Sequence, residues 1–249
     1  MIDVHSHIIP NVDDGSSSVS ETFEMIEEAR KIGFTDIILT SHFLLNSYET
    51  NSKELVFWKE KLQEVLDKKE IDVKLHSGME IYISSQMEEL IKKKKLLTLA
   101  NSRYMLIELP LSSTVKNLDY VLYFLESISI KPIIAHPERY KQFIKKPSMI
   151  NALIKEGMLF QLNAGSIAGN FGKDVKKTAQ KFLEHNVYSF IGSDAHRDRG
   201  RDTDMSEALK LLEKSQKRAF ISNASAMLDD EEVAFNGTAV KEKKFLGLF

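Results

Sequence analysis

The chain has 249 residues, of which 43% are hydrophobic and 28% are charged, and it contains no cysteine. This is the composition of an ordinary globular protein, and the length suits a single α/β barrel. The lack of cysteine excludes disulfides, thiolate metal ligands and a cysteine nucleophile. A formal net charge of −2 gives no sign of a nucleic-acid or membrane partner.

No apolar run is long enough to span a bilayer, and no basic segment followed by an apolar stretch marks a signal peptide. We therefore expect a cytoplasmic protein with no direct membrane insertion. No linker or composition shift divides the chain, so we expect one domain over residues 1–249.

Short apolar segments alternate with helical patterns along the chain. The expected strands are Ile2–His7, Asp36–His42, Val73–Ile81, Met105–Leu109, Pro132–His136, Leu159–Asn163 and Ser189–Asp194. Their nearly continuous apolarity is typical of strands that are buried on both faces. The expected helices are Val19–Ile32, Lys53–Lys68, Leu118–Ile128, Ser148–Lys155, Val175–His185 and Ser206–Lys214. This alternation predicts an α/β fold with a parallel sheet, either open or closed.

The first expected helix illustrates the pattern. Val19, Phe23 and Ile26 fall on one side of it, which we expect to be the buried face. Ser18 and Glu21 have the spacing of a capping box at its start.

Metal-binding residue types recur where the expected strands end. They are His5, His7, His42, Glu80, Glu108, His136, Asp194 and His196. In β/α barrels the carboxyl ends of the strands meet at one mouth, so these eight side chains should converge. Residues two apart on a strand point to the same side, which would pair His5 with His7 and Asp194 with His196. Pro137 predicts an extended backbone at His136.

One histidine on an apolar strand is ordinarily a hydrogen-bonded core residue, and one buried glutamate such as Glu108 proves little. Eight such residues at the same end of successive strands favour a metal site. His76, inside a strand, and His185, at a helix C-terminus, are expected to be structural. The Lys92–Lys95 run is expected to be a solvated helix end, with a docking surface for an acidic partner as the alternative.

Imidazole and carboxylate ligands suit Mn, Fe or Zn. Because carboxylates can bridge ions, the set could hold two or three of them. Closely spaced ions lower the pKa of a bridging water and clamp a phosphoryl oxygen. The pattern therefore predicts a metal-dependent phosphoester hydrolase.

Several short motifs carry a family resemblance. They are Val4–His7, Thr40–His42, Gly78–Glu80, Ala135–Arg139, Asn163–Ser166 and Ser193–His196. Together they resemble the polymerase-and-histidinol-phosphatase (PHP) superfamily. The opening Ile2–Pro10 with Asp13–Ser16, and the His-Pro-Glu-Arg that begins at His136, are similar to the manganese-dependent tyrosine-protein phosphatases of Gram-positive capsule and exopolysaccharide loci.

This resemblance implies a fold and a ligand set. The fold would be a distorted, TIM-like seven-stranded β/α barrel holding three Mn²⁺ ions. The implied sets are His5, His7, Glu80 and Asp194 for the first ion, Glu80, Glu108 and His136 for the second, and Asp14, His42 and His196 for the third. Asp14 lies in a loop, and only the resemblance singles it out.

The family also implies arginines that hold the substrate phosphate. Arg139 matches by motif. The second should come from the loop that follows His196, where we favour Arg201, with Arg199 next. For either loop arginine the alternative is a salt-bridged loop with Asp198, Asp202 and Asp204.

The implied reaction is in-line attack by a metal-bridging hydroxide on the phosphorus of phosphotyrosine. Phenolate leaves with a pKa of about 10, so strong acid assistance is not essential. His42 or a metal-bound water could supply a proton. The implied substrate is a tyrosine autokinase with a tyrosine-rich tail that regulates polysaccharide synthesis. The segment Lys241–Phe249 could contact this partner, or pack on its own barrel or a neighbouring subunit in a homo-oligomer.

Three alternatives stay open. A different PHP enzyme could hydrolyse histidinol phosphate, a nucleotide or a nucleic-acid 3′ end, although the near-neutral charge argues against nucleic acid. A non-catalytic metal-binding protein is the second, and the intact ligand set argues against it. Amide or lactone hydrolysis is the third. Related metal barrels often use a carbamylated lysine for it, and no lysine stands at a strand end among the motifs.

Overall fold

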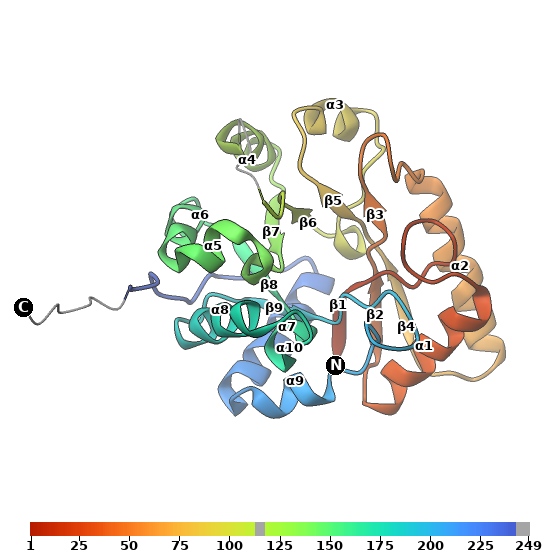
Figure 1. Cartoon of the computed structure of the whole chain (residues 1–249). Helices are drawn as coiled ribbons and strands as arrows, with labels where there is room; N and C mark the ends of the chain where they lie inside the picture. Colours follow the sequence, from red (N-terminus) through yellow and green to blue (C-terminus); the bar gives the residue numbers. More distant parts are fainter. Residues whose placement is uncertain (113–117, 243–249) are drawn as a thin grey trace, which may run out of the picture.

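The computed structural model describes residues 1–112 and 118–242 and shows strands surrounded by helices (Figure 1). The strands are β1 Ile2–Ser6, β2 Asp36–Leu39, β3 His42–Phe43, β4 Lys74–Ser77, β5 Glu80–Tyr82, β6 Tyr104–Glu108, β7 Lys131–Ala135, β8 Leu159–Asn163 and β9 Phe190–Gly192. The α-helices are α1 Val19–Lys31, α2 Ser52–Lys68, α3 Met87–Lys92, α4 Leu118–Ser127, α5 Lys141–Lys145, α6 Asn151–Lys155, α7 Ala164–Ala168, α8 Lys173–Glu184, α9 Ser206–Leu211 and α10 Lys214–Leu228. Three short 3₁₀ turns are η1 Leu99–Asn101, η2 Pro137–Arg139 and η3 Pro147–Ile150.

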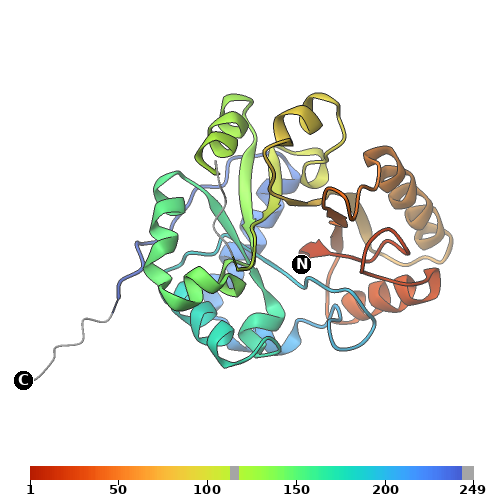
Figure 2. The same cartoon turned by 45° about the horizontal axis from the view of Figure 1, so that its top comes forward.

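These strands pair in parallel, as the sequence predicts, and form a curled sheet. One part has the order β1-β2-β4 and the other the order β3-β5-β6-β7-β8-β9. The segment after β9 returns to β1: the Asp194 amide donates to the His5 carbonyl, and the His7 amide donates to the Ala195 carbonyl, both at 2.8 Å. The first and last strands therefore lie side by side, with helices on the outside of the curl (Figure 2).

The predicted strands occur at the expected places, but two of them are interrupted. Asp36–His42 is divided into β2 and β3, and Val73–Ile81 into β4 and β5. The seven expected segments thus correspond to nine in the described residues. At these breaks the Glu80 amide donates to the carbonyls of both Thr40 and Ser41, which replaces the regular ladder.

The helices are also close to expectation, although the expected helix Ser148–Lys155 is α-helical only from Asn151, after the 3₁₀ turn η3. The buried face of α1 consists of Thr22, Met25, Ile26 and Ala29, whereas Val19 is 47% exposed. The expected face was therefore wrong at Val19, because the helix is rotated toward Met25. In addition, the expected helix Ser206–Lys214 ends as α9 at Leu211, and a separate helix, α10, begins at Lys214.

The cap of α1 is only half of the expected box. The Ser18 side chain accepts from the Glu21 amide at 3.2 Å, but the Glu21 carboxylate accepts from the Ser17 amide instead of that of Ser18.

The interior face of the sheet changes character along each strand. On β6, Tyr104 and Leu106 belong to a buried apolar cluster, and Glu108 follows two residues later on the same face. On β8, Leu159 is succeeded by Gln161 and Asn163 in the same way. Because alternate residues share a face, apolar packing fills the amino end of the curl, and polar side chains gather at the carboxyl end.

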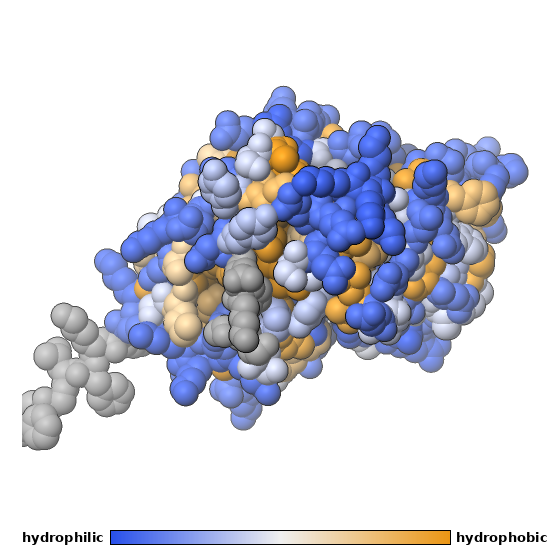
Figure 3. Space-filling model, turned by 90° about the horizontal axis from the view of Figure 1, so that it is seen from above, coloured by the Kyte–Doolittle hydropathy of each residue, from blue (hydrophilic) through white to orange (hydrophobic). Residues whose placement is uncertain are grey.

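The face seen from above is mainly hydrophilic, with hydrophobic side chains exposed between polar ones (Figure 3). Among the described residues, no helix is both long enough and apolar enough to cross a membrane.

Candidate metal centre

Four side chains from three parts of the sheet converge in a fully buried cluster. The Nε2 atoms of His5 and His7 lie 3.0 Å apart. Glu80 Oε2 is 3.2 Å from each of them, and Asp194 Oδ1 is 3.5 Å from each. These residues can jointly hold one ion. They are the four that the resemblance implies for the first metal.

The opposite nitrogens of both imidazoles are anchored by acceptors. His5 Nδ1 lies 3.0 Å from Gln161 Oε1, and His7 Nδ1 lies 2.9 Å from Asp13 Oδ2. In its neutral form each ring therefore carries the hydrogen on Nδ1, which leaves the Nε2 lone pairs facing each other and two carboxylate oxygens. Buried acceptors in such contact need a cation between them, so the donor set fits a divalent ion.

Glu80 extends the cluster toward Glu108. Glu80 Oε1 is 2.9 Å from His136 Nε2, and Glu80 Oε2 is 3.1 Å from His42 Nδ1. The atoms best placed to share an ion with Glu80 and Glu108 belong to His42. The resemblance implies His136 in that role, and His136 Nε2 lies 3.8 Å from Glu108 Oε1.

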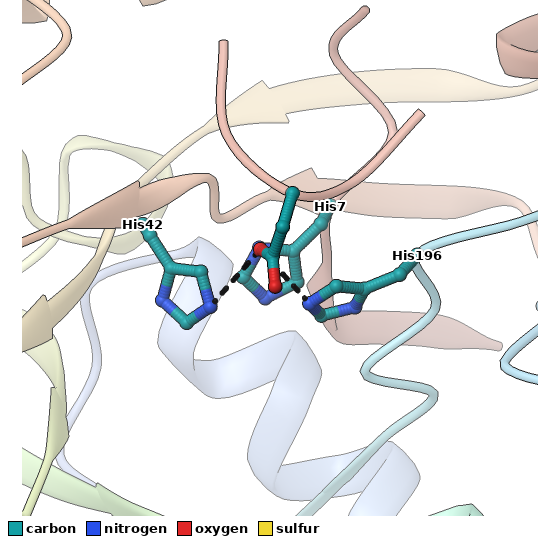
Figure 4. A group of neighbouring side chains, drawn as sticks. His7, His42 and His196 are labelled. Atoms are coloured by element: carbon teal, nitrogen blue, oxygen red, sulfur yellow. Dashed lines mark ion pairs between the residues drawn. The ribbon is translucent and has the colours of Figure 1, made fainter. Parts of the chain in front are cut away.

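A third group lies at the outer side of the cluster, where His7, His42 and His196 converge (Figure 4). Asp14 Oδ1 is 3.5 Å from His42 Nε2 and 3.4 Å from His196 Nε2. His196 Nδ1 lies 3.0 Å from the Asp194 carbonyl, so its Nε2 again presents a lone pair to a carboxylate. The structure thus brings Asp14, His42 and His196 together and adds His7 to them.

Protonation of the metal-free centre reflects this crowding of acceptors. Burial lowers the pKa of His7, but the carboxylates of Asp13 and Glu80 outweigh it and raise the pKa to about 10. Burial and the charge of Glu80 raise the pKa of Glu108 to about 9. Protons on these two groups therefore occupy the place of a cation at neutral pH.

His136 and His196 behave differently. Burial, together with the charge of Arg139, lowers the pKa of His136 to about 4, and burial, together with His7, lowers that of His196 to about 4. Both rings are neutral at pH 7 and keep a lone pair that can bind metal.

Two of these residues depart from extended backbone, which corrects the sequence analysis. His136 has φ 32° and ψ 56°, so Pro137 does not hold it extended as predicted. Asp194 has φ 53° and lies beyond the end of β9, so Asp194 and His196 do not form a strand pair. Left-handed backbone is strained for residues other than glycine and is concentrated at functional sites.

Two arginines reach the centre and meet at one carboxylate. Arg139 Nη1 is 2.7 Å from Asp194 Oδ2, and Arg201 Nη2 is 2.7 Å from Asp194 Oδ1. Burial raises the pKa of Asp194, but the positive charges of His5, Arg201 and Arg139 outweigh it and hold that pKa well below its usual range. Arg199 is not part of the centre: its side chain is 93% exposed and lies beside Asp198.

A cavity of about 260 Å³ opens above these groups. Its wall includes Asp14, His42, Glu80, Glu108, His136, Asp194, both arginines, and the side chains of Leu44, Tyr48 and Tyr82. Tyr48 stacks on His42, with ring centroids 5.9 Å apart and planes inclined by 15°. The cavity is therefore lined by polar metal-binding groups and by the aromatic side chains of Tyr48 and Tyr82.

Sequence reasoning missed the residues that support this centre. Gln161 and Asp13 orient His5 and His7, and the Asn163 amide donates to Asp194 Oδ2 at 2.6 Å. Glu138 accepts from the Asn163 backbone amide at 3.0 Å and from the Tyr188 hydroxyl at 2.9 Å. The signal for Gln161 and Asn163 was present, because both are polar residues on one face of an otherwise apolar strand.

The residues set aside as structural lie outside the centre. His76 Nε2 is 2.8 Å from Asp36 Oδ1, and His185 is the C-cap of α8. Lys92 and Lys93 are exposed and pair with Glu88 and Glu89, as a solvated helix end does. In the proposed docking tail Lys241–Phe249, residues 243–249 lie outside the described part of the chain.

Fold and site together define a class: a parallel β/α protein with a buried imidazole–carboxylate centre at the carboxyl ends of its strands. The model of the family "Capsular polysaccharide synthesis, CpsB/CapC" matches residues 1–229. The chain belongs to this family.

Relatives of this chain are similar to it over all or nearly all of its length. The tyrosine-protein phosphatase YwqE of Bacillus subtilis (strain 168) is 32% identical over 254 residues, which span 100% of both chains. The tyrosine-protein phosphatase CpsB of Streptococcus agalactiae serotype III (strain NEM316) is 30% identical, over 94% of this chain and 100% of the relative. A chain from the crystal structures of YwqE from Bacillus subtilis and CpsB from Streptococcus pneumoniae, described as unique metal-dependent tyrosine phosphatases, superposes with a TM-score of 0.91. It is 31% identical, over 97% of this chain and 100% of that one.

The anchoring of His7 by Asp13 gives a first prediction. We expect Asp13→Ala to weaken Mn²⁺ binding about 10- to 100-fold, because the His7 ring loses the partner that fixes its tautomer and orientation. Isothermal titration calorimetry measures the change. Asp36→Ala is the matched control, since Asp36 holds His76 in a similar pair outside the centre. Equal Mn²⁺ affinity in the two variants would contradict the assignment.

The raised pKa of His7 gives a second prediction. Below pH 10 the metal-free protein holds a proton on His7 that an ion must displace, so apparent affinity for Mn²⁺ should rise with pH. Each proton released contributes about tenfold per pH unit, and the Glu108 proton acts in the same direction. Competition with a chelator of known affinity at pH 6.5 and 7.5 measures the slope. An affinity that does not change with pH would show that no proton is displaced.

Proposed function

We propose that this protein is a metal-dependent protein-tyrosine phosphatase. The observation that carries the proposal is the cluster of buried acceptors around Glu80 and Asp194, with two arginines at its edge, on the floor of a cavity. The relatives that span the chain are tyrosine-protein phosphatases, and the matching solved structure is described as metal-dependent.

The metal we propose is manganese, in three sites, with Fe and Zn as the alternatives. The ligands would be His5, His7, Glu80 and Asp194 for the first ion, Glu80, Glu108 and His136 for the second, and Asp14, His42 and His196 for the third. The close contacts of His42 with Glu80 and of His7 with the third group favour ions that share ligands. A mixed nitrogen and oxygen set suits these borderline to hard divalent ions.

Two arginine side chains would bind the phosphoryl group of the substrate. Arg139 and Arg201 would bind the phosphoryl oxygens, since guanidinium groups match the geometry of phosphate. The Nε donor of Arg201 is buried and has no acceptor among the described residues, so it is free to bind an incoming oxygen. Bound divalent ions would supply an activated water and neutralise charge on the phosphoryl group.

The proton for the leaving phenolate would come from a metal-bound water, or from His42 if one of its ring nitrogens does not bind metal. His42 lies at the wall of the cavity, with a side chain that is 17% exposed, and is therefore more accessible than His5 or His7. An aryl group would contact Leu44, Tyr48 and Tyr82, which supports an aromatic phosphoester as the substrate.

We propose that the protein substrate is the phosphotyrosine tail of a tyrosine autokinase that regulates capsular or exopolysaccharide synthesis. The phosphatase would act on this tail in the cytoplasm. The family's description in capsular polysaccharide synthesis supports this assignment. A flexible tail suits a centre that opens through a cavity at one end of the curled sheet.

We also propose that the whole chain, 1–249, is one PHP-type phosphatase domain and that the sheet is a distorted seven-stranded barrel. In this view β2 with β3, and β4 with β5, are single interrupted strands. The hydrogen bonds between the segment after β9 and β1 support closure.

The test measures phosphate release from a phosphotyrosine peptide, from histidinol phosphate and from a 3′-phosphorylated single-stranded DNA, each with Mn²⁺ and with EDTA. We expect Mn²⁺-dependent turnover of the peptide and none in EDTA, because the chain offers no cysteine nucleophile. Turnover of histidinol phosphate alone would keep the metal chemistry but overturn the tyrosine-phosphatase assignment. Full activity of His136→Ala or Asp194→Ala would overturn the metal centre itself.

The two loop arginines give a matched pair of variants. We expect Arg201→Ala to lower kcat/KM for the peptide about 100-fold, because it removes a donor to the transferring group. Arg199→Ala should stay within about twofold, since this exposed side chain lies outside the cavity. Steady-state kinetics on purified variants decide between them, and the reverse order of effects would assign phosphate binding to Arg199.

A further inference from the structure

Phe171 lies against both arginines of the centre. The Cζ atom of Arg139 is 4.6 Å from the centroid of its ring, and that of Arg201 is 5.9 Å away. Both distances fall within the range of cation–π attraction, in which the negative face of an aromatic ring holds a guanidinium group. Phe171 does not line the cavity above the metal centre, so its contact with that cavity passes through the arginines.

The backbone around Phe171 fixes the ring in this position. The residue lies in the turn between α7 and α8, with Gly169 at φ +110° and Gly172 at φ +92° on either side. The ring packs on α7: a Cβ atom at Gly165 would lie 3.0 Å from Phe171 Cε2. Since α7 follows β8 directly, the ring is tied to the strand that also carries Asn163 (Figure 1).

The two arginines come from different loops and share few contacts. Arg139 is in the turn after β7, and Arg201 is in the loop after β9. The described residues bring them together at two places, the Asp194 carboxylate and the Phe171 ring. When Asp194 binds an ion and the arginines bind phosphate, the carboxylate is shared with other charges. The Phe171 ring can still contact both guanidinium groups, and it does not compete with phosphate for their N–H donors.

We propose that Phe171 is a positioning residue, which holds Arg139 and Arg201 side by side for a phosphoryl group. This inference rests on the proposed function, because it assigns the arginines to phosphate. A second cavity of about 440 Å³ also borders Arg201, and Phe171 and Lys176 form part of its lining. Without the ring, the Arg201 side chain could swing into this space and away from the substrate.

The test compares Phe171→Leu with Phe171→Tyr. Leucine keeps an apolar side chain but removes the aromatic face, so KM for a phosphotyrosine peptide should rise about tenfold, while kcat changes less than about threefold. The inhibition constant of inorganic phosphate should rise by the same factor. Tyrosine restores the face and should return both values to within about twofold of the starting protein. Mn²⁺ affinity and the thermal midpoint of Phe171→Leu should stay unchanged, which a merely structural role would not predict.

Phe57→Leu is the matched control, because Phe57 on α2 makes an exposed cation–π contact with Lys61 and does not line the cavity of the centre. Unaltered KM and phosphate inhibition in Phe171→Leu would overturn the proposal, as would a fall in kcat with no change in KM. If the unmodified protein does not hydrolyse the peptide, the proposed function fails. Direct calorimetric binding of inorganic phosphate to the Mn²⁺-loaded protein then decides on Phe171 alone, and equal affinity in Phe171→Leu and the unmodified protein would reject its role.

Discussion

The structure depends on one electrostatic constraint: lone pairs that face each other in a buried space. His5 and His7 turn their Nε2 atoms to one another at 3.0 Å, with an oxygen of Glu80 3.2 Å from both. Gln161 and Asp13 prevent either ring from relieving the contact by turning its N–H inward, because each acceptor holds the Nδ1 hydrogen. Only a proton or a metal cation can occupy such a space. The raised pKa of His7 reflects the need for positive charge in this space, and the donor set could meet the same need by binding a metal ion.

The fold places these buried acceptors at one end of the sheet. Along the interior face of β6 and β8, apolar residues give way to Glu108, Gln161 and Asn163 within two or four positions. The apolar half supplies the burial free energy that stabilises the strands, and the polar half would be unstable without its partners. His136 and Asp194 stand in left-handed backbone at this boundary. Strain of this kind persists where surrounding hydrogen bonds fix the chain, as the bonds of the Asp194 amide to His5 and of the His136 amide to Gln161 do.

The sequence was sufficient to predict the parallel α/β class and the convergence of eight side chains, because both follow from periodicity and from the ends of strands. Asp14 came only from family resemblance, since a loop aspartate before Gly15 has no periodicity to reveal it. The conformations of His136 and Asp194 were not predictable, because they are set by tertiary hydrogen bonds rather than by Pro137 or strand spacing. The rotation of α1 toward Met25 escaped prediction for a related reason: packing against the sheet decides which of two overlapping helical faces is buried.

The charges of the centre also imply an order of binding. Among the described residues of the metal-free centre, the carboxylates of Asp13, Asp14, Glu80 and Asp194 face two guanidinium groups and the proton on His7, and Asp194 engages both guanidinium groups. A phosphate dianion that approached the metal-free cavity would therefore have to compete with the Asp194 carboxylate for both guanidinium groups. Asp194 would bind a divalent ion in the loaded centre, and the added positive charge would free guanidinium donors for phosphate. We therefore expect metal binding to precede substrate binding, with the ring of Phe171 keeping the two guanidinium groups together during that exchange.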